Sequence, residues 1–526
     1  MQNHRSILWR SAASACALFG LLTLAAQQQP RFVGRIVDGR TGQPLAASVV
    51  LRNAGGEAVE LAGEHPHVQY LQKRWCYADG QFEAPGDAGG FTVEIRRGLE
   101  TLPVRTTIDS GVSEQTFRLE RWINMADRGY MSGDSHVHLL SPAQSHLQMR
   151  AEDLSALSLL VSDFTNDVDI FTGRLDQIST PGHAVYVGQE FRDWQQGHIN
   201  LLRLRRIIEP LQPFGGIFQK ATNRHQLLAP AARQARAQGA VVNWAHFGNI
   251  PGTESPIDIA LGLIDAVELI TYDDPTGPPP HWEPWRMEQP SDLPALPKLP
   301  GLDLYYHYLN AGFRLPMTAG TDKMSEVIPV GSNRFYAKVG EEQTFDAWIA
   351  GLKAGNGFIT NGPMLTFEAD DRESGEVVEF QEPQTVTARA TARSIHPFTR
   401  LQIIVNGEAV ATSAPPTRDA AGIYGTELET RINLDGSAWA AARVSEPSRE
   451  GKLILPRDLT VFAHANPVYF LRDGAKVRVQ ESIDHLLLYL RYSRHWFRTA
   501  AEFETEPQKQ EAVQAAEQAL EFYLRL

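Results

Sequence analysis

The sequence predicts a multidomain protein in which an α/β domain lies between two β-sandwich domains and is followed by a C-terminal helical segment. The chain has 526 residues, too many for one compact core, so about two to four domains are expected. Alternating apolar and polar residues, the pattern of half-buried strands, dominate residues 30–121 and 366–474. Between these regions, apolar runs of strand length alternate with amphipathic helical patterns, which is typical of a parallel α/β sheet or barrel.

The first 26 residues have the features of a secretory signal peptide. Arg5 and Arg10 give a positive start to the chain, and the apolar run ACALFGLLTLAA ends in Ala25 and Ala26 before QQQP. A membrane span needs about 20 apolar residues, so the shorter run favours a cleaved signal over an uncleaved anchor. We therefore expect an exported protein, periplasmic or secreted, with no stable membrane insertion after cleavage.

The composition limits the kinds of partner that the protein can have. The formal net charge is −13 at pH 7, which argues against nucleic acid or an anionic membrane surface as the main partner. The only cysteines are Cys16, in the predicted signal, and Cys76, so no intramolecular disulfide framework and no cysteine metal site are expected. A small-molecule substrate is the expected partner, and the sequence leaves the oligomeric state open.

Residues 30–121 form the first predicted β domain. The segment RFVGRIVDGRTGQPLAASVVLRN contains two alternating strands around a turn, and GGFTVEIRRG and TFRLERW add further strands. This order of short strands and glycine-rich turns resembles the carboxypeptidase regulatory-like β-sandwich. That resemblance implies an accessory domain rather than a catalytic one.

In the α/β region, residues 128–365, six polar side chains or pairs stand where apolar runs end. They are His136 and His138, Asp163, Glu190, His198, His246 and Asp322. Catalytic groups collect at the C-terminal ends of the strands in parallel barrels, so these side chains are expected to meet at one mouth. Imidazole and carboxylate groups bind zinc, manganese or iron, and the set could hold two ions if one carboxylate bridges them. A single histidine is more often a core or loop residue, but the whole ordered set favours a metal site.

The same residues carry a resemblance to a known family. GDSHVHLL is similar to the GDLHVHT opening of the PHP (polymerase and histidinol phosphatase) superfamily of metal-dependent hydrolases. VGQEF, GHINLL, NWAHF and AGTD resemble later motifs of that superfamily and follow in the same order. GFITNGPML and VNGE (Val405 to Glu408) resemble segments of its carbaryl-hydrolase-like branch. The resemblance covers residues 128–475.

The resemblance implies a fold and a set of metal ligands. The α/β domain would be a distorted (β/α)7 barrel of the PHP type. His136, His138 and Asp322 would hold a first divalent ion and His198 and His246 a second, with Glu190 bridging the two. Glu190, Asp322 and His246 would be the catalytic residues.

The chain also departs from the family pattern. Ser162-Asp163-Phe164 stands where the family commonly has TDH, Thr321-Asp322-Lys323-Met324 replaces SDxH, and SPAQSH replaces the usual S-D-G. These positions mostly serve a third metal ion in the family, so two ions are predicted here. Asp163 could remain as a weak or indirect ligand. Lys323 could offer positive charge to a substrate, although a surface lysine is the simpler interpretation.

Residues 366–526 are predicted to form a second β-sandwich and two helices. TVTARATARS, RLQIIVNGEAV and YGTELETRINL alternate like strands, and NG is a hairpin signal. The segments DHLLLYLRYSRHWFRTAAEF and QKQEAVQAAEQALEFYLRL, within residues 475–526, carry helical apolar stripes. We expect both helices to pack against the body of the protein.

Together these features predict an exported hydrolase that uses two divalent ions to activate water. The bond attacked is a phosphoester or a carbamate, ester or amide, and zinc, manganese and, as a further option, iron all suit the ligands. No G-x-S-x-G motif supports serine catalysis. The alternative is a non-catalytic exported binding or scaffold protein built on a decayed barrel. The flanking sandwiches and the lost TDH favour that alternative, and the six retained ligands count against it.

Overall fold

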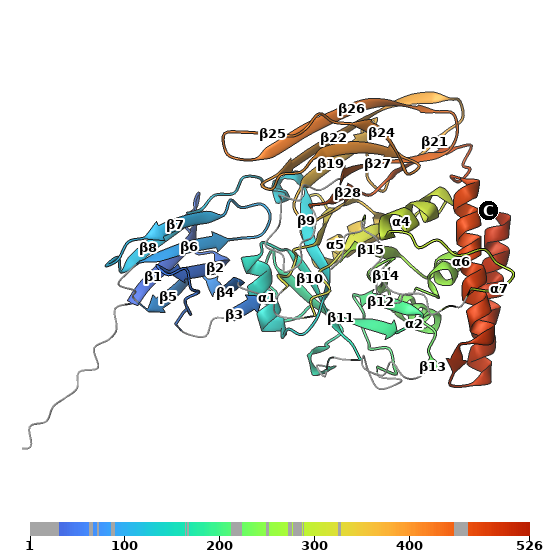
Figure 1. Ribbon diagram of the computed structural model, residues 1–526, viewed down its shortest axis with the longest axis horizontal. Helices are drawn as coiled ribbons and strands as arrows, with labels where there is room; N and C mark the ends of the chain where they lie inside the picture. Colours follow the sequence, from blue (N-terminus) through green and yellow to red (C-terminus); the bar gives the residue numbers. More distant parts are fainter. Residues whose placement is uncertain are drawn as a thin grey trace, which may run out of the picture.

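The computed structural model describes most of the chain after residue 30. The described residues are 31–62, 67–70, 73–85, 90–163, 165, 168–211, 224–248, 252–271, 276, 287, 289–324, 328–445 and 461–526. The predicted signal peptide, residues 1–26, lies outside them. None of the described helices is long and apolar enough to cross a membrane. A small sheet domain lies at one end of the molecule, and a pair of helices lies at the other (Figure 1).

The N-terminal domain consists of two sheets that face each other. The smaller sheet has the order β5 (Gln81–Pro85), β1 (Arg31–Asp38), β8 (Glu114–Leu119). The larger has the order β3 (His67–Tyr70), β4 (Lys73–Asp79), β2 (Ala46–Asn53), β6 (Phe91–Arg96), β7 (Val104–Ile108). Apolar side chains from both sheets share one core that includes Phe32, Val49, Phe82 and Val93. The alternating pattern of the sequence therefore places one face of each sheet inside a sandwich.

The central region is built on a curled sheet of parallel and antiparallel strands. In sheet order these are β16 (Met317–Ala319), β15 (Ala266–Ile270), β14 (Val241–Trp244), β12 (Gly197–Leu202), β11 (Ala184–Asp193), β10 (Ala156–Val161), β9 (Tyr130–Val137), β17 (Arg334–Lys338) and β18 (Gly357–Thr360). The sheet curls so far that β16 contacts β9 and β18. Its connections include α1 (Pro142–Ala151), α2 (Ala229–Ala237), α3 (Ser255–Ala260), α4 (Gly301–Asn310) and α5 (Phe345–Ala354). The described strands thus form a half-barrel, and the closed (β/α)7 barrel stays a prediction.

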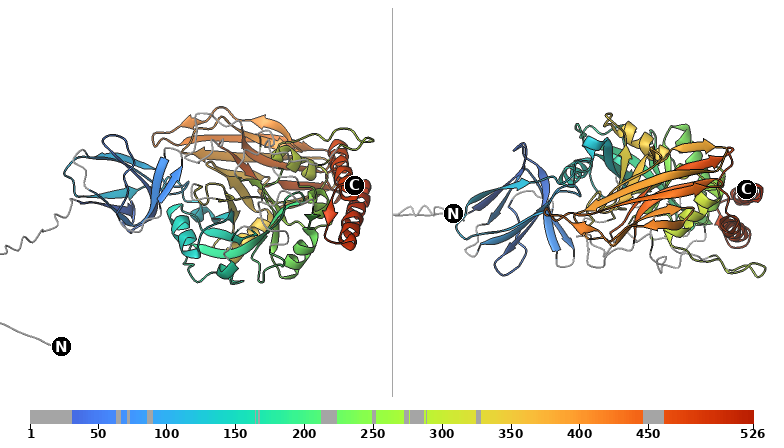
Figure 2. Two further views of the ribbon diagram at one scale, coloured as in Figure 1. Left: turned by 60° about the horizontal axis from the view of Figure 1, so that its bottom comes forward. Right: turned by 90° about the horizontal axis from the view of Figure 1, so that it is seen from above.

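The central sheet continues into the C-terminal sandwich without a break. Beyond β18 its order is β28 (Ala463–Ala465), β27 (Ala438–Ser445), β23 (Arg400–Val405), β24 (Glu408–Thr412), with β29 (Val468–Arg472) and β21 (Val377–Phe380) beside β27. A second sheet covers it, in the order β20 (Arg372–Glu373), β19 (Met364–Ala369), β22 (Gln384–Ser394), β26 (Tyr424–Leu434), β25 (Thr417–Arg418). Figure 2 shows these layers along one side of the molecule. The predicted boundary between residues 365 and 366 falls inside β19, and the central sheet passes from β18 directly to β28 of the C-terminal sandwich.

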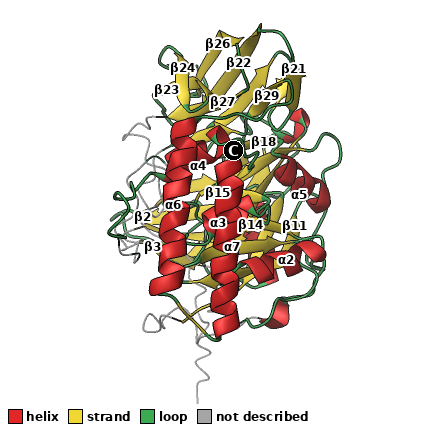
Figure 3. Cartoon of the chain, turned by 90° about the vertical axis from the view of Figure 1, so that its right-hand side faces the viewer, coloured by secondary structure: helices red, strands yellow, loops and turns green. Residues whose placement is uncertain are grey.

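The two predicted C-terminal helices are present as α6 (Gln480–Thr499) and α7 (Glu506–Arg525). Thr505 and Gln508 form a capping box that satisfies backbone groups at the start of α7. The helices lie side by side (Figure 3) and contact each other, and both contact α3, while α6 also contacts α4. Their apolar stripes are therefore buried against the central region, as expected from the sequence.

Two buried carboxyl groups on and beside α3 make the stability of this region depend on pH. Glu254 is 1% and Asp258 0% exposed, and Glu254 accepts the backbone N–H groups of Leu228 and Ala229 at 2.8 and 3.0 Å. Burial raises the pKa of Glu254 from 4.5 to about 8. Burial and the nearby Glu254 raise the pKa of Asp258 well above 3.8. The folded protein therefore holds protons that the unfolded chain has released, so stability falls as pH rises through this window.

We expect Asp258→Asn to weaken this pH dependence. A group that stays protonated only in the folded state contributes up to about 1.4 kcal/mol per pH unit, so between pH 6 and 8 the variant should lose less unfolding free energy than the parent. Urea unfolding at the two pH values measures the difference. Asp371→Asn, at an exposed aspartate, is the matched control and should follow the parent. An Asp258→Asn curve parallel to that of the parent would contradict this prediction.

Candidate metal centre

The topology of the central sheet brings the predicted ligands to one end of the strands. His136 and His138 stand at the end of β9, and Glu190 lies in the last part of β11. His246 and Asp322 follow β14 and β16, which point the same way as β9. β12 runs antiparallel to β11, so its second residue, His198, returns to the same end. Five strands thereby deliver six side chains to one mouth.

The first group of ligands consists of His136, His138 and Asp322, all buried. The Nε2 atoms of the two histidines are 2.9 Å apart, and Oδ1 of Asp322 lies 3.3 Å from the first and 3.8 Å from the second. Ligand atoms around a tetrahedral zinc ion, each about 2.0–2.1 Å from it, are about 3.3 Å apart. The observed separations bracket that value, so these three atoms can share one ion.

The second group consists of Glu190, His198 and His246, which are also buried. Nδ1 of His198 lies 3.1 Å from Oε1 of Glu190 and 3.0 Å from Nε2 of His246. Oε1 of Glu190 is also 3.6 Å from Nε2 of His136, and its Oε2 is 3.5 Å from Nε2 of His138. The Glu190 carboxylate therefore lies between the two groups, the position of a bridging ligand.

The hydrogen bonds around the first group place the single ring hydrogen of each neutral histidine on Nδ1. Nδ1 of His138 lies 2.8 Å from the backbone oxygen of Leu160, which only accepts, so this nitrogen carries the hydrogen. Nδ1 of His136 donates in the same way to Oε2 of Glu268 at 2.8 Å. In the neutral rings both Nε2 atoms then present lone pairs to each other and to carboxylate oxygens. Such a cluster of buried acceptors suits a cation, so these residues fit a metal ion.

The electrostatics of the site also favour positive charge. Burial lowers the pKa of His136, but Glu268 and Asp322 outweigh it and raise the pKa to about 10. Arg192 and His198 hold the pKa of the Glu190 carboxyl well below its usual range despite burial. Burial and Arg192 lower the pKa of His198 to about 3, which keeps this ring in the neutral form that binds metals. Its Nε2 atom has no hydrogen-bond partner among the described residues.

A supporting layer of carboxylates holds the ligands in place. Glu268 accepts from His136, from the backbone N–H of His246 at 3.1 Å and from Oγ of Ser135 at 3.1 Å. A Cβ atom on Gly320 would lie 2.2 Å from Oε1 of Glu268 and 2.6 Å from Cβ of His136. Only glycine fits at this position without displacing the carboxylate that orients both histidines.

Asp134 fixes the segment that carries Asp322. Its carboxylate accepts the backbone N–H groups of His136 and Thr321, each at 3.0 Å, and the Thr321 hydroxyl at 2.7 Å. Two ligands have positive backbone φ angles, 34° at His246 and 43° at Asp322. Backbone of this kind persists in non-glycine residues only where the surroundings enforce it, and here Glu268 and Asp134 do so.

The two further predicted residues lie at the border of the site. Asp163 accepts from Oγ of Ser162 at 3.3 Å, and the same hydroxyl lies 3.3 Å from Oε2 of Glu190. Asp163 is thus joined to the bridging carboxylate through Ser162 and is absent from both ligand groups. The interpretation of Lys323 as a surface residue is wrong, because its side chain is 1% exposed and donates to the backbone oxygen of Ile328.

Glu268 and Arg192 belong to the site but were not predicted from the sequence. Glu268 is the one charged residue in the apolar strand AVELI, a signal that could have marked it. Arg192 follows Glu190 by two positions in the same strand, so both point to one face. Its guanidinium lies 3.8 Å from Oε2 of Glu190 and 3.7 Å from Oδ1 of Asp163.

Comparisons of the chain with protein-family models and with curated proteins found no match in either. The geometry of the two buried groups therefore carries the functional argument.

Proposed function

We propose that the protein is an exported metal-dependent hydrolase of the PHP type. The observation that carries the proposal is a pair of buried triads of potential metal-ligating atoms, in which the Glu190 carboxylate of one triad also lies beside the histidines of the other. The ordered motifs of residues 128–365 support the family and a distorted (β/α)7 barrel. The first 26 residues support export.

The residues of the mouth suit hydrolysis as well as metal binding. A divalent ion held by either triad would polarise a carbonyl or phosphoryl oxygen and lower the pKa of water towards about 7. His136, His138 and Asp322 orient one side of the site, and His198 and His246 orient the other. The Arg192 guanidinium, 9% exposed in its side chain, adds a fixed positive charge that would stabilise negative charge developing on a substrate oxygen. Phosphoesters, carbamates, esters and amides all develop such charge.

Metal analysis followed by a substrate panel tests the proposal. We expect the purified protein to hold about two divalent ions per chain after incubation with zinc or manganese, and the variant His136→Ala/His138→Ala to lose at least one. The loaded parent should hydrolyse at least one p-nitrophenyl phosphate, carbamate or carboxylic ester, and the variant should do so at least about 100-fold more slowly.

The matched control is His146→Ala/His183→Ala. This pair of histidines, with ring centroids 6.3 Å apart, belongs to neither ligand group and should keep both metal and activity when replaced. Absence of bound metal in the parent would refute the metal site. Metal without hydrolysis of any substrate class would favour the alternative of a binding or scaffold protein.

A further inference from the structure

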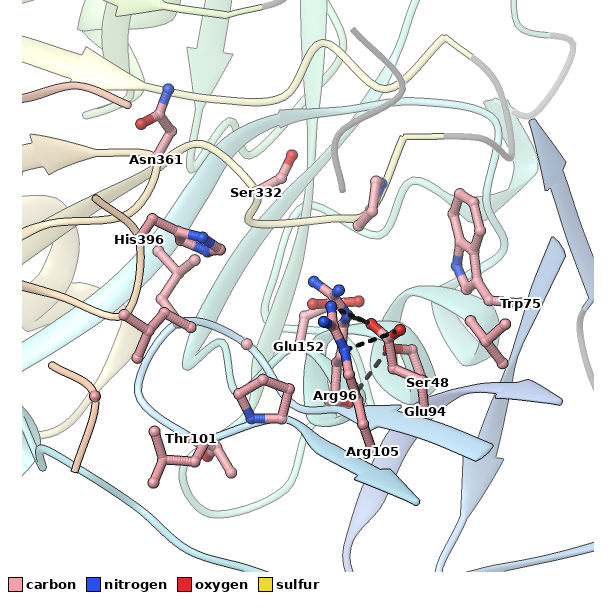
Figure 4. A pocket seen from close by; sticks show the side chains of 18 of the residues that line it. Ser48, Trp75, Glu94, Arg96, Thr101, Arg105, Glu152, Ser332, Asn361 and His396 are labelled. Atoms are coloured by element: carbon pink, nitrogen blue, oxygen red, sulfur yellow. Dashed lines mark hydrogen bonds and ion pairs between the residues drawn. The ribbon is translucent and has the colours of Figure 1, made fainter. Parts of the chain in front are cut away.

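A cleft whose lining includes none of the candidate metal ligands lies where the three sheet regions meet. Its volume is about 780 Å³, within the range of small-molecule sites, about 300–1,000 Å³. The N-terminal sandwich supplies strands β2, β6 and β7, the central region supplies Glu152 and Arg334, and the C-terminal sandwich supplies His396 and Arg418. Figure 4 shows Arg96 and Arg105 reaching into the cleft beside Glu94 and Glu152, with His396 on the facing side.

The described lining of this cleft is strongly positive. Five arginines line it, with only two carboxylates: Arg52, Arg96, Arg105, Arg334 and Arg418 against Glu94 and Glu152. The whole chain has a net charge of −13, so the sign of the cleft is opposite to that of the protein. Positive charge gathered on low-dielectric walls focuses the field and attracts anions.

The contacts of these arginines show which of them support the fold and which leave positive charge for a ligand. Arg334 is 0% exposed and donates to the backbone oxygens of Gly331, Asp153 and Glu152, so it supports the wall. Glu94 alone pairs with both Arg96 and Arg105, which leaves one excess positive charge. Arg418 donates to the backbone oxygen of Gly422 at 3.3 Å and lies over the ring of Tyr424, and neither contact neutralises its charge.

Two neutral groups in the lining support an anionic occupant. The Oγ atom of Ser332, a residue only 9% exposed, has no hydrogen-bond partner among the described residues. A buried hydroxyl without a partner is costly, and an oxyanion would accept from it. Burial lowers the pKa of His396 to about 4, and the positive charges of Arg96 and Arg105 act in the same direction.

We propose that this cleft binds a small polyanion, a molecule with two or more carboxylate, phosphate or sulfate groups. Arginines on opposite walls match oxyanions by paired hydrogen bonds, and the N- and C-terminal sandwiches each contribute some of them. Trp75, 6% exposed, adds an aromatic surface for an apolar part of the ligand. This inference is independent of the proposed hydrolase function.

Titration calorimetry with benzene-1,3,5-tricarboxylate tests the proposal on the full chain. We expect saturable binding, weakened at least about 10-fold by Arg105→Gln/Arg418→Gln, since charge-assisted hydrogen bonds are lost. The side chain of Arg105 is 63% exposed and Arg418 is exposed, so both replacements should leave the fold intact. Binding should persist in the variant His136→Ala/His138→Ala, which separates the cleft from the metal centre.

The matched control is Arg118→Gln/Arg431→Gln, which removes two exposed arginines outside the cleft lining. It changes the net charge equally and should leave the dissociation constant within about twofold of the parent. The uncharged benzene-1,3,5-tricarboxamide should not bind. The proposal is overturned if the tricarboxylate does not bind, if both double variants weaken it equally, or if binding disappears with the metal ligands.

Discussion

Replacing Glu190 with alanine is expected to empty both halves of the metal centre at once. The two carboxylate oxygens of Glu190 lie 3.1–3.7 Å from nitrogen atoms of all four ligating histidines. Without it, each half keeps two or three ligand atoms, and the positive charges of two ions would face each other without a shared anion. Metal affinity should fall more than about 100-fold, beyond the loss typical of indirect contacts. Metal content after dialysis, with hydrolysis of the best substrate, measures the effect.

His246→Ala provides the comparison that makes the Glu190 result interpretable. His246 belongs to one triad only, so its replacement should release one ion and leave the other in place. Equal metal loss in the two variants would mean that the halves are filled as one unit. Retention of two ions in Glu190→Ala would contradict the bridging position.

Glu268→Gln is expected to lower metal affinity by about 10–100-fold, although Glu268 is assigned to neither ligand group. Glutamine keeps the size of the side chain but removes the negative charge that makes the His136 ring more basic. The amide oxygen of the glutamine could still accept from Nδ1 of His136. A change in metal affinity would therefore result from the lost charge and not from a change in side-chain shape. Glu268 is therefore a positioning residue, and the measurement is the dissociation constant for zinc or manganese at several pH values.

If Glu268 had only a structural role, its replacement would change stability and not the metal dissociation constant, as expected for Glu100. Glu100 is a buried carboxylate, 5% exposed, that accepts the backbone N–H of Met125 and the hydroxyl of Tyr336. Glu100→Gln should lower stability and leave the metal dissociation constant unchanged. Glu268→Asp should recover part of the affinity, because the charge returns. If Glu268→Gln changed only the melting temperature, its role in positioning would be refuted.

The sequence predicts those parts of the molecule whose signals are local. The alternation in residues 31–119 and the helical stripes of α6 and α7 report which side of each element is buried, whatever the partner is. Five of the six candidate ligands were predictable because each stands at or near the end of an apolar run, and the ends of parallel strands meet. His198 instead stands at the start of the antiparallel strand β12. The structure brings the six residues into two groups.

The missed features depend on contacts between distant parts of the chain. Glu268 contacts His136 across 132 positions, so its own strand gives no sign of the partner. Lys323 follows Asp322 in a polar segment and resembles a surface residue, yet it is 1% exposed and its backbone pairs with Val137 at the end of β9. The pairing of β18 with β28 joins residues about a hundred positions apart, which no periodicity reveals. Local patterns therefore identified the ligands but not the residues that hold them.

The unbroken sheet from β9 to β24 has a consequence for how this protein can be divided. A fragment ending at residue 365 would leave β18 with an open edge, because its partner β28 comes from residues 463–465. Exposed edges of this kind promote aggregation. The C-terminal sandwich thus covers an edge of the sheet that bears the candidate ligands, so residues 128–474 should be expressed as one piece.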